Sequence, residues 1–548
     1  MPNKRSITLL ILLALLALLG GQHILELRAE EPRRAIVAME MVLNQEYAAA
    51  TINDLPYYNK PPGFNWAVAA SYRLLGSMGE WATRFPSILA FLLMVLANYL
   101  FVRRALGPVT ALLSSAFLVT SADLLFYGTV NSGEIDLFFS CIVYLQAMSI
   151  FWFWQRRQWW PMFLISYALC GIGMLVKPPA VLFQGFTLLA LALYDKRMRV
   201  LFGLPHMAGL ALFALIVGGY FYSYPGDGAA YLVHLFAEGA DKTGASNTFG
   251  DIMAGAAEFP LQLLKLMAPW SILLLFWFRK GFMRELLADP FMRFCGLFIV
   301  ANIWVYWFSG DVHLRYVYMF IPFFCALLAH SFVRYAHRWK RMKHYLESGL
   351  GVVMALAASA VLVAAWFMKL PLEDGTVWRP SGVWMVSAIA AGGMAALAWL
   401  YWKQSAHRML LLAALMLMLR CWFNYTVLPF TDAGKALTYK ERVGELLAIT
   451  GSEAVHWAGP SWRFPVELNI VGNTLVSAEL ESATKLAYQL PYYISKGNGH
   501  VMRWDRELQP DTYYLMYIGM AEKLELEPLF QIRDRWLSKE LVLVRTGK

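Results

Sequence analysis

Long apolar runs alternate with short polar segments over most of the chain. Between residues 7 and 428 these runs are about 16 to 22 residues long, enough for a helix to cross the hydrocarbon core of a bilayer. They cover residues 7–23, 84–102, 107–126, 136–154, 159–176, 180–194, 200–222, 263–278, 292–309, 316–333, 348–367, 382–402 and 409–428. Pro178 and Pro179 interrupt the stretch 159–194, which leaves the counting of its runs open. The pattern predicts a mostly α-helical, polytopic membrane protein with about thirteen transmembrane helices.

The basic residues between the runs are unevenly distributed. They cluster at every second connection, at Lys4/Arg5, Arg103/Arg104, Arg156/Arg157, Lys196/Arg197/Arg199, Arg279/Lys280, 334–343 and Lys403/Arg408. The positive-inside rule places such clusters in the cytoplasm. We therefore expect a cytoplasmic N-terminus and, after an odd number of spans, an extracytoplasmic C-terminal segment.

Composition agrees with a protein surrounded mostly by lipid. Of the 548 residues, 59% are hydrophobic and 15% are charged, whereas a soluble domain carries roughly a quarter charged residues. The formal net charge of +10 follows from the loop clusters, so we expect a bilayer partner and no nucleic acid.

The first run lacks a small-x-small cleavage site and is expected to remain as a span. All five cysteines lie in predicted spans, so no disulfide framework is expected.

The segments outside the runs predict two further parts of the fold. Residues 24–83 contain "EEPRRAIVAMEMVL" and "NKPPGFNWAVAASYRLLG", two proline-initiated amphipathic helices that we expect in the membrane interface. From about residue 430, "KALTYKERVGELLAI" predicts a soluble helix, and "VELNIVG", "TYYLMYIG" and "ELVLVRTG" predict strands. We thus expect a transmembrane domain, 1–429, which includes the first outer loop, and a small extracytoplasmic α/β domain, 430–548.

Several charged residues lie on the predicted outer side, against the positive-inside rule. The basic ones are Lys60, Arg84, Lys177, His313, Arg315 and Arg420, and the acids on the same side are Glu30, Glu31, Glu134 and Asp136. A cation that is partly desolvated at the membrane edge needs an anion, which can be a carboxylate or a lipid phosphate. The P-loop, GxGxxG, HExxH and GxSxG motifs are absent from the sequence.

Each candidate acid also has a structural explanation. Glu30 and Glu31 can favour the N-terminus of the helix that begins near Pro32. Glu134 can be a solvated loop acid, and Asp136 can be a helix cap.

The candidate basic residues have structural explanations as well. Lys177 can extend its ammonium group to the membrane interface, and Arg84 can pair with a nearby acid. His313 alone is a weak ligand candidate, and Arg315 can form an ordinary salt bridge.

Five segments carry a resemblance to a known family. In order and spacing, "AEEPRRAIVAMEM", "YYNKPPGFNW", "TRFPS", "EIDLFF" and "GMLVKPPAVL" resemble the bacterial lipid A aminoarabinose transferases and the related protein O-mannosyltransferases. These are membrane glycosyltransferases of the GT-C class, which use a polyprenyl-phosphate-linked sugar. The motifs cover roughly the first 200 residues, and the remainder matches by architecture.

The resemblance implies roles for individual residues. Glu30, Glu31 and Asp136 would be catalytic, with Glu30 as base and Asp136 as supporting acid. Donor phosphate would be bound by Arg33, Lys60 and Lys177. From their place on the predicted outer side, we also expect Arg84 and Arg315 to bind the donor phosphate, and we expect a substrate pocket that includes Tyr57, Tyr58, Asn59, Glu134 and His313. Two residues depart from the family pattern: Glu30 replaces an Asp, and Asn59 replaces an acid that contributes to a metal site in some relatives. We therefore predict no metal site, although a divalent cation as cofactor stays open.

The resemblance implies a glycosyltransferase that moves a sugar from a polyprenyl-phosphate-linked donor to a hydroxyl or phosphate acceptor, with inversion. The acceptor can be a lipid, a glycan or a protein. We expect a monomer in the bacterial inner (cytoplasmic) membrane, with a cytoplasmic N-terminus and a periplasmic C-terminal domain. One alternative is a transporter or flippase of a lipid-linked substrate, although the sequence shows no internal repeat. Another is a glycan ligase or polymerase that uses a diphosphate-linked donor.

Overall fold

The computed structural model of the chain describes residues 3–126, 132–240, 249–308, 313–336, 338–371, 377–404, 407–433, 438–459, 468–471, 474–477, 486–505, 507–534 and 539–547. The chain folds into two compact units. The first, which we call the helical unit, comprises Met1–Leu25, Ser87–Tyr222 and Leu232–Gly434. The second, which we call the mixed unit, comprises Glu26–Pro86, Ser223–Tyr231 and Lys435–Lys548.

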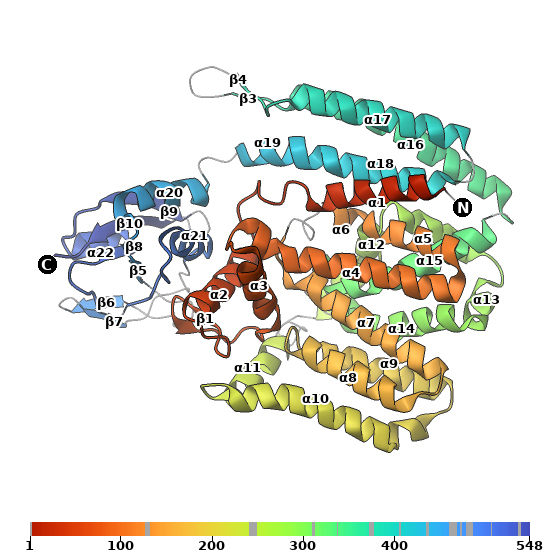
Figure 1. Cartoon of the computed structure of the whole chain (residues 1–548), viewed down its shortest axis with the longest axis horizontal. Helices are drawn as coiled ribbons and strands as arrows, with labels where there is room; N and C mark the ends of the chain where they lie inside the picture. The colour runs from red at the N-terminus through yellow and green to blue at the C-terminus, as the bar shows by residue number, and fades with distance from the viewer. Residues whose placement is uncertain are drawn as a thin grey trace. The chain divides into compact units, whose positions relative to one another are not determined.

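The helical unit is built almost entirely from helices. In chain order, wholly or for most of their length, they are α1 (Lys4–Leu19), α4 (Glu80–Leu106), α5 (Pro108–Val119), α6 (Ala122–Phe126), α7 (Ile135–Gln155), α8 (Trp159–Met174), α9 (Ala180–Tyr194), α10 (Leu204–Ser223), α11 (Gly228–Ala240), α12 (Phe249–Leu266), α13 (Phe282–Ala288), α14 (Pro290–Trp307), α15 (Ile321–Tyr335), α16 (Lys340–Phe367), α17 (Val383–Lys403), α18 (Arg408–Trp422) and α19 (Leu428–Ala433). Turns of 3₁₀-helix occupy Met198–Phe202, Trp270–Phe278 and Leu314–Phe320, and Phe423–Val427 forms a π-helical turn. Consecutive helices pack on one another, as α7 does on α8 and α16 on α17 (Figure 1).

Many of these helices have the length and composition of membrane spans. Among the described residues, eight helices are long and apolar enough to cross a membrane, or nine if one pair bent by 115° counts as a single span. Shorter apolar helices include Pro108–Val119, Trp159–Met174 and Ala180–Tyr194. The predicted mostly α-helical architecture is therefore confirmed, while the number of about thirteen spans stays a prediction.

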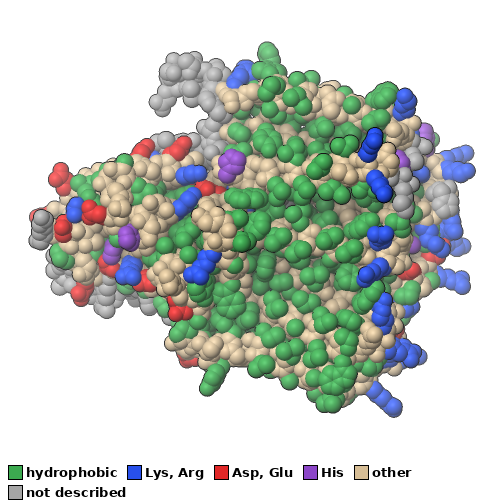
Figure 2. All heavy atoms as spheres, in the orientation of Figure 1, with side chains coloured by type: hydrophobic (Ala, Val, Ile, Leu, Met, Phe, Trp, Pro, Cys, Tyr) green, Lys and Arg blue, Asp and Glu red, His purple; other side chains and the backbone are tan. Residues whose placement is uncertain are grey.

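The surface of the helical unit is divided between apolar and basic regions. On the face drawn in Figure 2, hydrophobic side chains cover the helices, and Lys and Arg side chains gather at one end. Arg103, Arg104, Arg156 and Arg157, from two of the predicted basic clusters, are exposed. An apolar belt next to a basic rim is the distribution that the positive-inside rule describes.

The mixed unit combines three segments that are far apart in the sequence. Its elements are α2 (Glu31–Leu43), β1 (Thr51–Ile52), β2 (Leu55–Pro56), α3 (Gly63–Leu75), α20 (Tyr439–Thr450), β5 (Val455–Ala458), β6 (Leu468–Val471), β7 (Thr474–Ser477), α21 (Gln489–Asn498), β8 (Tyr513–Tyr517), α22 (Ile518–Lys523), β9 (Phe530–Asp534) and β10 (Lys539–Arg545). The main sheet has the order β5-β8-β10-β9, in which β5 runs parallel to β8 and the other pairs are antiparallel. A buried apolar cluster that includes Met516, Val542 and Val544 packs against Leu508 and Leu524.

The predicted elements outside the spans are present in this unit. Helices α2 and α3 occupy the two proline-initiated segments, and α20, β8 and β10 occupy three of the predicted C-terminal segments. Strand β6 lies in "VELNIVG" but pairs with β7 in a separate two-stranded sheet. We predicted that residues 24–83 belong with the transmembrane domain, whereas most of them group with the C-terminal segment here.

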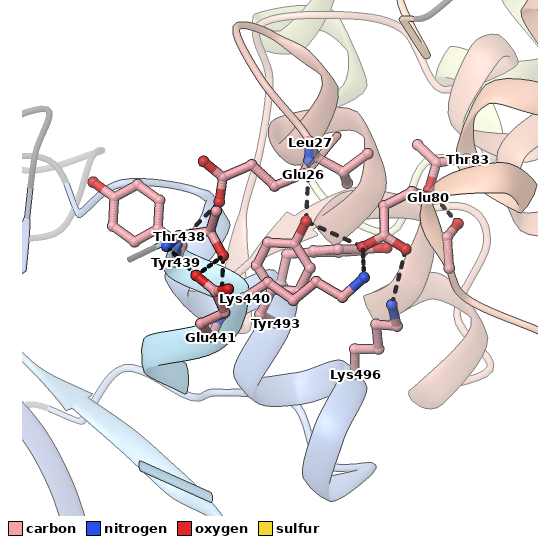
Figure 3. A network of polar contacts seen from close by, with 12 residues as sticks. Glu26, Leu27, Glu80, Thr83, Thr438, Tyr439, Lys440, Glu441, Tyr493 and Lys496 are labelled. Atoms are coloured by element: carbon pink, nitrogen blue, oxygen red, sulfur yellow. Dashed lines mark hydrogen bonds and ion pairs between the residues drawn. The ribbon is translucent and has the colours of Figure 1, made fainter. Parts of the chain in front are cut away.

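A polar network explains why these segments form one unit (Figure 3). The backbone N–H of Leu27 donates to the Tyr493 hydroxyl at 3.0 Å, and that hydroxyl donates to Glu80 at 3.3 Å. Lys440 and Lys496 pair with the two Glu80 oxygens at 3.1 and 3.2 Å. The Glu80 carboxylate is buried, so the two ammonium groups compensate for its lost hydration.

Candidate active site

Glu30 begins a cluster of charged residues at the start of α2. It occupies the N-cap position, yet its side chain makes no capping hydrogen bond. Its carboxylate instead pairs with Arg33 and lies 3.8 Å from the Arg34 guanidinium. The Glu30 side chain is 38% exposed, whereas that of Arg34 is 3% exposed. An acid held by two arginines and still open on one side suits contact with a ligand better than helix capping alone.

Tyrosines from two distant segments complete this Glu30 cluster. Arg34 donates to the Tyr57 hydroxyl at 3.1 Å, and Tyr57 is fully buried. The Arg33 guanidinium lies 5.7 Å from the centre of the Tyr488 ring, a cation–π distance. Burial raises the pKa of Tyr488, against the opposing effect of Arg33. Arg34 and Tyr488 were not among the predicted site residues: Arg34 was visible in "EEPRR", whereas nothing near Tyr488 in the sequence linked it to Arg33.

Lys60 follows the hairpin that β1 and β2 form, and it is held by contacts with backbone carbonyl groups. Its ammonium group donates to the carbonyl of Asn59 at 2.8 Å, and the Tyr231 hydroxyl donates to the carbonyl of Lys60 at 2.6 Å. The Tyr58 ring lies 5.1 Å from that of Tyr231 and 6.1 Å from that of Tyr224. The predicted pocket residues Tyr58 and Asn59 thus lie beside Lys60 within the mixed unit.

Glu31 has a different environment from its neighbour Glu30. Its two oxygens accept from Arg84 Nε at 2.8 Å and Nη2 at 3.0 Å, and both side chains are buried, at 0% and 1% exposure. The backbone N–H of Arg28 also donates to Glu31 at 3.0 Å. This bidentate pair favours a structural role for Glu31 and Arg84 over the catalytic and phosphate-binding roles that we predicted for them.

We expect Arg84→Gln to destabilise the protein by about 3–5 kcal/mol, because it leaves the Glu31 carboxylate buried without its cation. The measurement is thermal unfolding in detergent. The double variant Glu31→Gln/Arg84→Gln removes both charges and is expected to recover part of the loss. If the Arg84→Gln protein stays stable but no longer binds donor lipid, the result would instead support the predicted phosphate-binding role of Arg84.

Glu40 holds the hairpin that leads to Tyr57 and Lys60. Its carboxylate accepts from Thr51 Oγ1 at 2.6 Å and from the backbone N–H groups of Asn53 and Asp54 at 2.7 and 3.2 Å. Asn53 and Asp54 have φ values of 56° and 61°, which a tight two-residue hairpin turn requires and which Asn and Asp tolerate. Burial raises the pKa of Glu40 from 4.5 to about 7, despite these hydrogen bonds.

The stability of the folded protein should therefore fall as the pH rises from 4.5 to about 7. Because the folded protein holds the Glu40 proton more tightly than the unfolded chain, ionisation between pH 4.5 and about 7 costs at most about 3 kcal/mol. We expect Glu40→Gln to remove this component of the pH slope. The measurement is thermal unfolding between pH 5 and 8, with Glu527→Gln as an exposed control that keeps the slope. Parallel pH profiles for wild type and Glu40→Gln would contradict the prediction.

A second cluster lies in the helical unit, at the start of α7. Lys177, between α8 and α9, donates to Asp136 at 2.7 Å. Arg315 donates to Glu134 at 2.7 Å, and its Nε lies 3.6 Å from the second Asp136 oxygen. We call these four residues the Asp136 cluster. The structure thus brings together four of the predicted site residues, and Glu134, the N-cap residue of α7, makes no side-chain capping hydrogen bond.

An aromatic residue covers the two cations of the Asp136 cluster. The Lys177 ammonium lies 4.1 Å and the Arg315 guanidinium 5.7 Å from the centre of the Tyr316 ring. The predicted residue His313 contacts the same ring, with 5.4 Å between centroids. Lys177 and Arg315 keep 16% and 25% of their side chains exposed, while Asp136 is buried at 5%. Cations more exposed than their acids are placed to receive another anion.

The described residues contain no group of three or more His, Cys, Asp or Glu side chains that could hold a metal ion. Within each cluster, arginine or lysine lies within a few ångströms of a carboxylate. Such an arrangement can neutralise a phosphate and accept a proton.

Comparison with solved structures defines the class of fold. The structure matches ArnT from Cupriavidus metallidurans bound to undecaprenyl phosphate, with a TM-score of 0.70 and 17% sequence identity over 99% of this chain and 98% of that chain. The apo state of the same protein matches with a TM-score of 0.67 and 16% identity, over 98% and 97% of the two chains. The chain has the fold of the GT-C membrane glycosyltransferases.

Sequence comparisons point to the same relatives. The family described as dolichyl-phosphate-mannose-protein mannosyltransferase matches residues 59–220. An undecaprenyl phosphate-alpha-4-amino-4-deoxy-L-arabinose arabinosyl transferase from Pseudomonas aeruginosa (strain UCBPP-PA14) is 28% identical over 193 residues. That match spans 34% of this chain and 34% of the relative. The resemblance to the aminoarabinose transferase and O-mannosyltransferase type is confirmed.

Proposed function

We propose that the chain is a glycosyltransferase that moves a sugar from a polyprenyl-phosphate-linked donor to an acceptor hydroxyl or phosphate. The observation that carries this proposal is the Asp136 cluster, in which Lys177 and Arg315 are held by two buried acids yet remain partly exposed. The likeness to a structure named as bound to undecaprenyl phosphate supports the donor class.

In this reaction the acceptor oxygen forms a bond to the anomeric carbon, and the bond from that carbon to the phosphate oxygen breaks. The leaving polyprenyl phosphate gains a negative charge, which Lys177 and Arg315 stabilise because their positions are set before the reaction. Asp136 orients Lys177 through the bond of 2.7 Å. One positioned carboxylate, Glu30, takes the acceptor proton, and a single displacement inverts the anomeric carbon.

The supporting residues are assigned from their contacts. Arg33 and Arg34 orient Glu30, and Tyr57 holds Arg34. Lys60, Tyr58 and Asn59 bind the donor beside the hairpin, as the family resemblance implies. No bound metal ion is required in this scheme, since side-chain cations supply the positive charge.

The placement of the protein in the membrane belongs to the same proposal. The chain crosses a bacterial inner membrane about thirteen times, with its N-terminus in the cytoplasm and residues 430–548 outside. The basic rim in Figure 2 supports the cytoplasmic assignment of one end of the helices. The protein acts as a monomer on a lipid, glycan or protein acceptor.

The experiment that tests this function uses the purified protein in liposomes with sugar-labelled polyprenyl phosphate. Label should pass to an acceptor extracted from the membrane, and the matched polyprenyl diphosphate sugar should be a much poorer donor. Transfer from the diphosphate donor alone would identify a ligase or polymerase. Movement of intact donor across the bilayer without bond formation would identify a flippase. Either result would refute the proposal.

A further inference from the structure

A polar cavity in the mixed unit lies apart from the Glu30 cluster. Its volume is about 300 Å³, at the lower end of the range for small-molecule sites. His456 on β5 and His500 and Arg503 after α21 line it, together with Leu43 and Asn44 at the end of α2. The described residues that line this cavity include no Asp or Glu.

His456 is held in one orientation by residues that do not line the cavity. Its Nδ1 lies 2.6 Å from Asp505 Oδ2, and the Tyr514 hydroxyl donates to the same oxygen at 2.6 Å. Burial alone would raise the pKa of Asp505, but the hydrogen bonds from His456 and Tyr514 lower it below its usual value. A carboxylate at Nδ1 fixes the proton on that nitrogen and orients the ring.

Arg503 is exposed and pairs with an acid that does not line the cavity. Its Nε lies 3.4 Å from Asp54 Oδ2, and Asn44 donates to the other Asp54 oxygen at 3.2 Å. The side chain of Asn53 donates to the carbonyl of Met502 at 2.7 Å. The Asn53–Asp54 turn, which Glu40 stabilises, therefore sets the position of Arg503.

We propose that this cavity binds a phosphate monoester group. Its donors are one guanidinium and two imidazoles, the groups that proteins use to bind a compact dianion. The acids that pair with them, Asp505 and Asp54, are not among the residues that line the cavity, so the lining itself carries no negative charge. Leu43 supplies an apolar surface beside the phosphate, suited to the ring of a sugar or the start of a lipid chain. This binding site goes beyond the proposed sugar transfer and involves none of its residues.

The test uses the full-length protein in detergent, without donor or acceptor. The probes are inorganic phosphate, glucose 6-phosphate, and phosphatidic acid in mixed micelles. Binding is measured by calorimetry, and modification of individual histidines by diethyl pyrocarbonate is read by peptide mass spectrometry. We expect a phosphate monoester to protect His456 and His500. Protection by glucose 6-phosphate identifies a soluble ligand, and protection by phosphatidic acid alone identifies a lipid headgroup.

Two variants and a control complete the design. Because a hydrogen bond to a charged group contributes about 1.5–3 kcal/mol, Arg503→Gln should raise the Kd at least about tenfold. Asp505→Asn should weaken binding through His456 and raise modification of that ring. Arg533→Gln is the matched control: this exposed arginine on β9 also lies near an acid, 3.7 Å from Glu540, but does not line the cavity. Absence of protection by every probe, or equal Kd values for the two arginine variants, would overturn the proposal.

Discussion

Glu30→Gln reduces sugar transfer by about 10²–10⁴-fold and leaves the fold intact. This expected range is the one that loss of a general base typically produces. The substitution keeps the shape of the side chain while it removes the negative charge that pairs with Arg33 and Arg34. The initial rate is measured with labelled polyprenyl-phosphate sugar at saturating donor, so that weakened donor binding does not lower it.

Two controls separate a chemical role from a structural one. Glu522→Gln, an exposed substitution in the same unit, should transfer sugar at the wild-type rate. Glu30→Asp keeps the carboxylate and matches the residue of the related family, so it should retain more activity than Glu30→Gln. Full activity of the Gln variant would remove Glu30 from the mechanism.

Lys177→Gln weakens donor binding by about ten- to a hundredfold, the second large effect that we expect. The ammonium group contributes a charge-assisted contact to the phosphate, worth about 1.5–3 kcal/mol. Binding is measured by calorimetry with a polyprenyl phosphate in detergent. Lys280→Gln, an exposed change in the same unit, should bind as wild type does.

The ion pair with Asp136 complicates that variant, because Lys177→Gln also leaves this acid with Arg315 alone at 3.6 Å. The double variant Lys177→Gln/Asp136→Asn removes the unmatched negative charge. If Lys177 contacts the phosphate, the double variant stays weak in donor binding although its stability recovers. Restored donor binding in the double variant would mean that Lys177 serves only to neutralise Asp136.

The local elements of the fold could be predicted from sequence because their causes are local. Apolar runs became helices, and the segments of α2, α3, β8 and β10 have the periodicity of the structures they form. Asp136 and Lys177 were both predicted as site residues, because both lie at span ends on the same predicted side. The observed bond of 2.7 Å confirms their proximity, although their roles in the reaction stay a prediction.

The other features of the fold and of the site depend on long-range contacts, which have no local signature in the sequence. Glu30 and Glu31 look alike in sequence, but successive positions on a helix point about 100° apart, and only Glu31 meets Arg84. Tyr488 reaches Arg33 from a segment that reads as an ordinary soluble domain. Two domains were predicted, but the grouping of residues 26–86 with the C-terminal segment was not, since it depends on pairs such as Leu27 and Tyr493.

The mixed unit is built from segments that are far apart in the sequence, and this sets an order of events during synthesis. Asn53 bonds to the backbone of Met502, 449 residues later in the chain. At about 5–20 residues per second, the ribosome needs about 20–90 s to deliver this partner. During that interval residues 26–86 lack their final neighbours in the mixed unit. Assembly of the Glu30 cluster is therefore a late event. A chain that ends before Tyr488 carries Glu30 and Arg33 without the tyrosine ring that contacts Arg33.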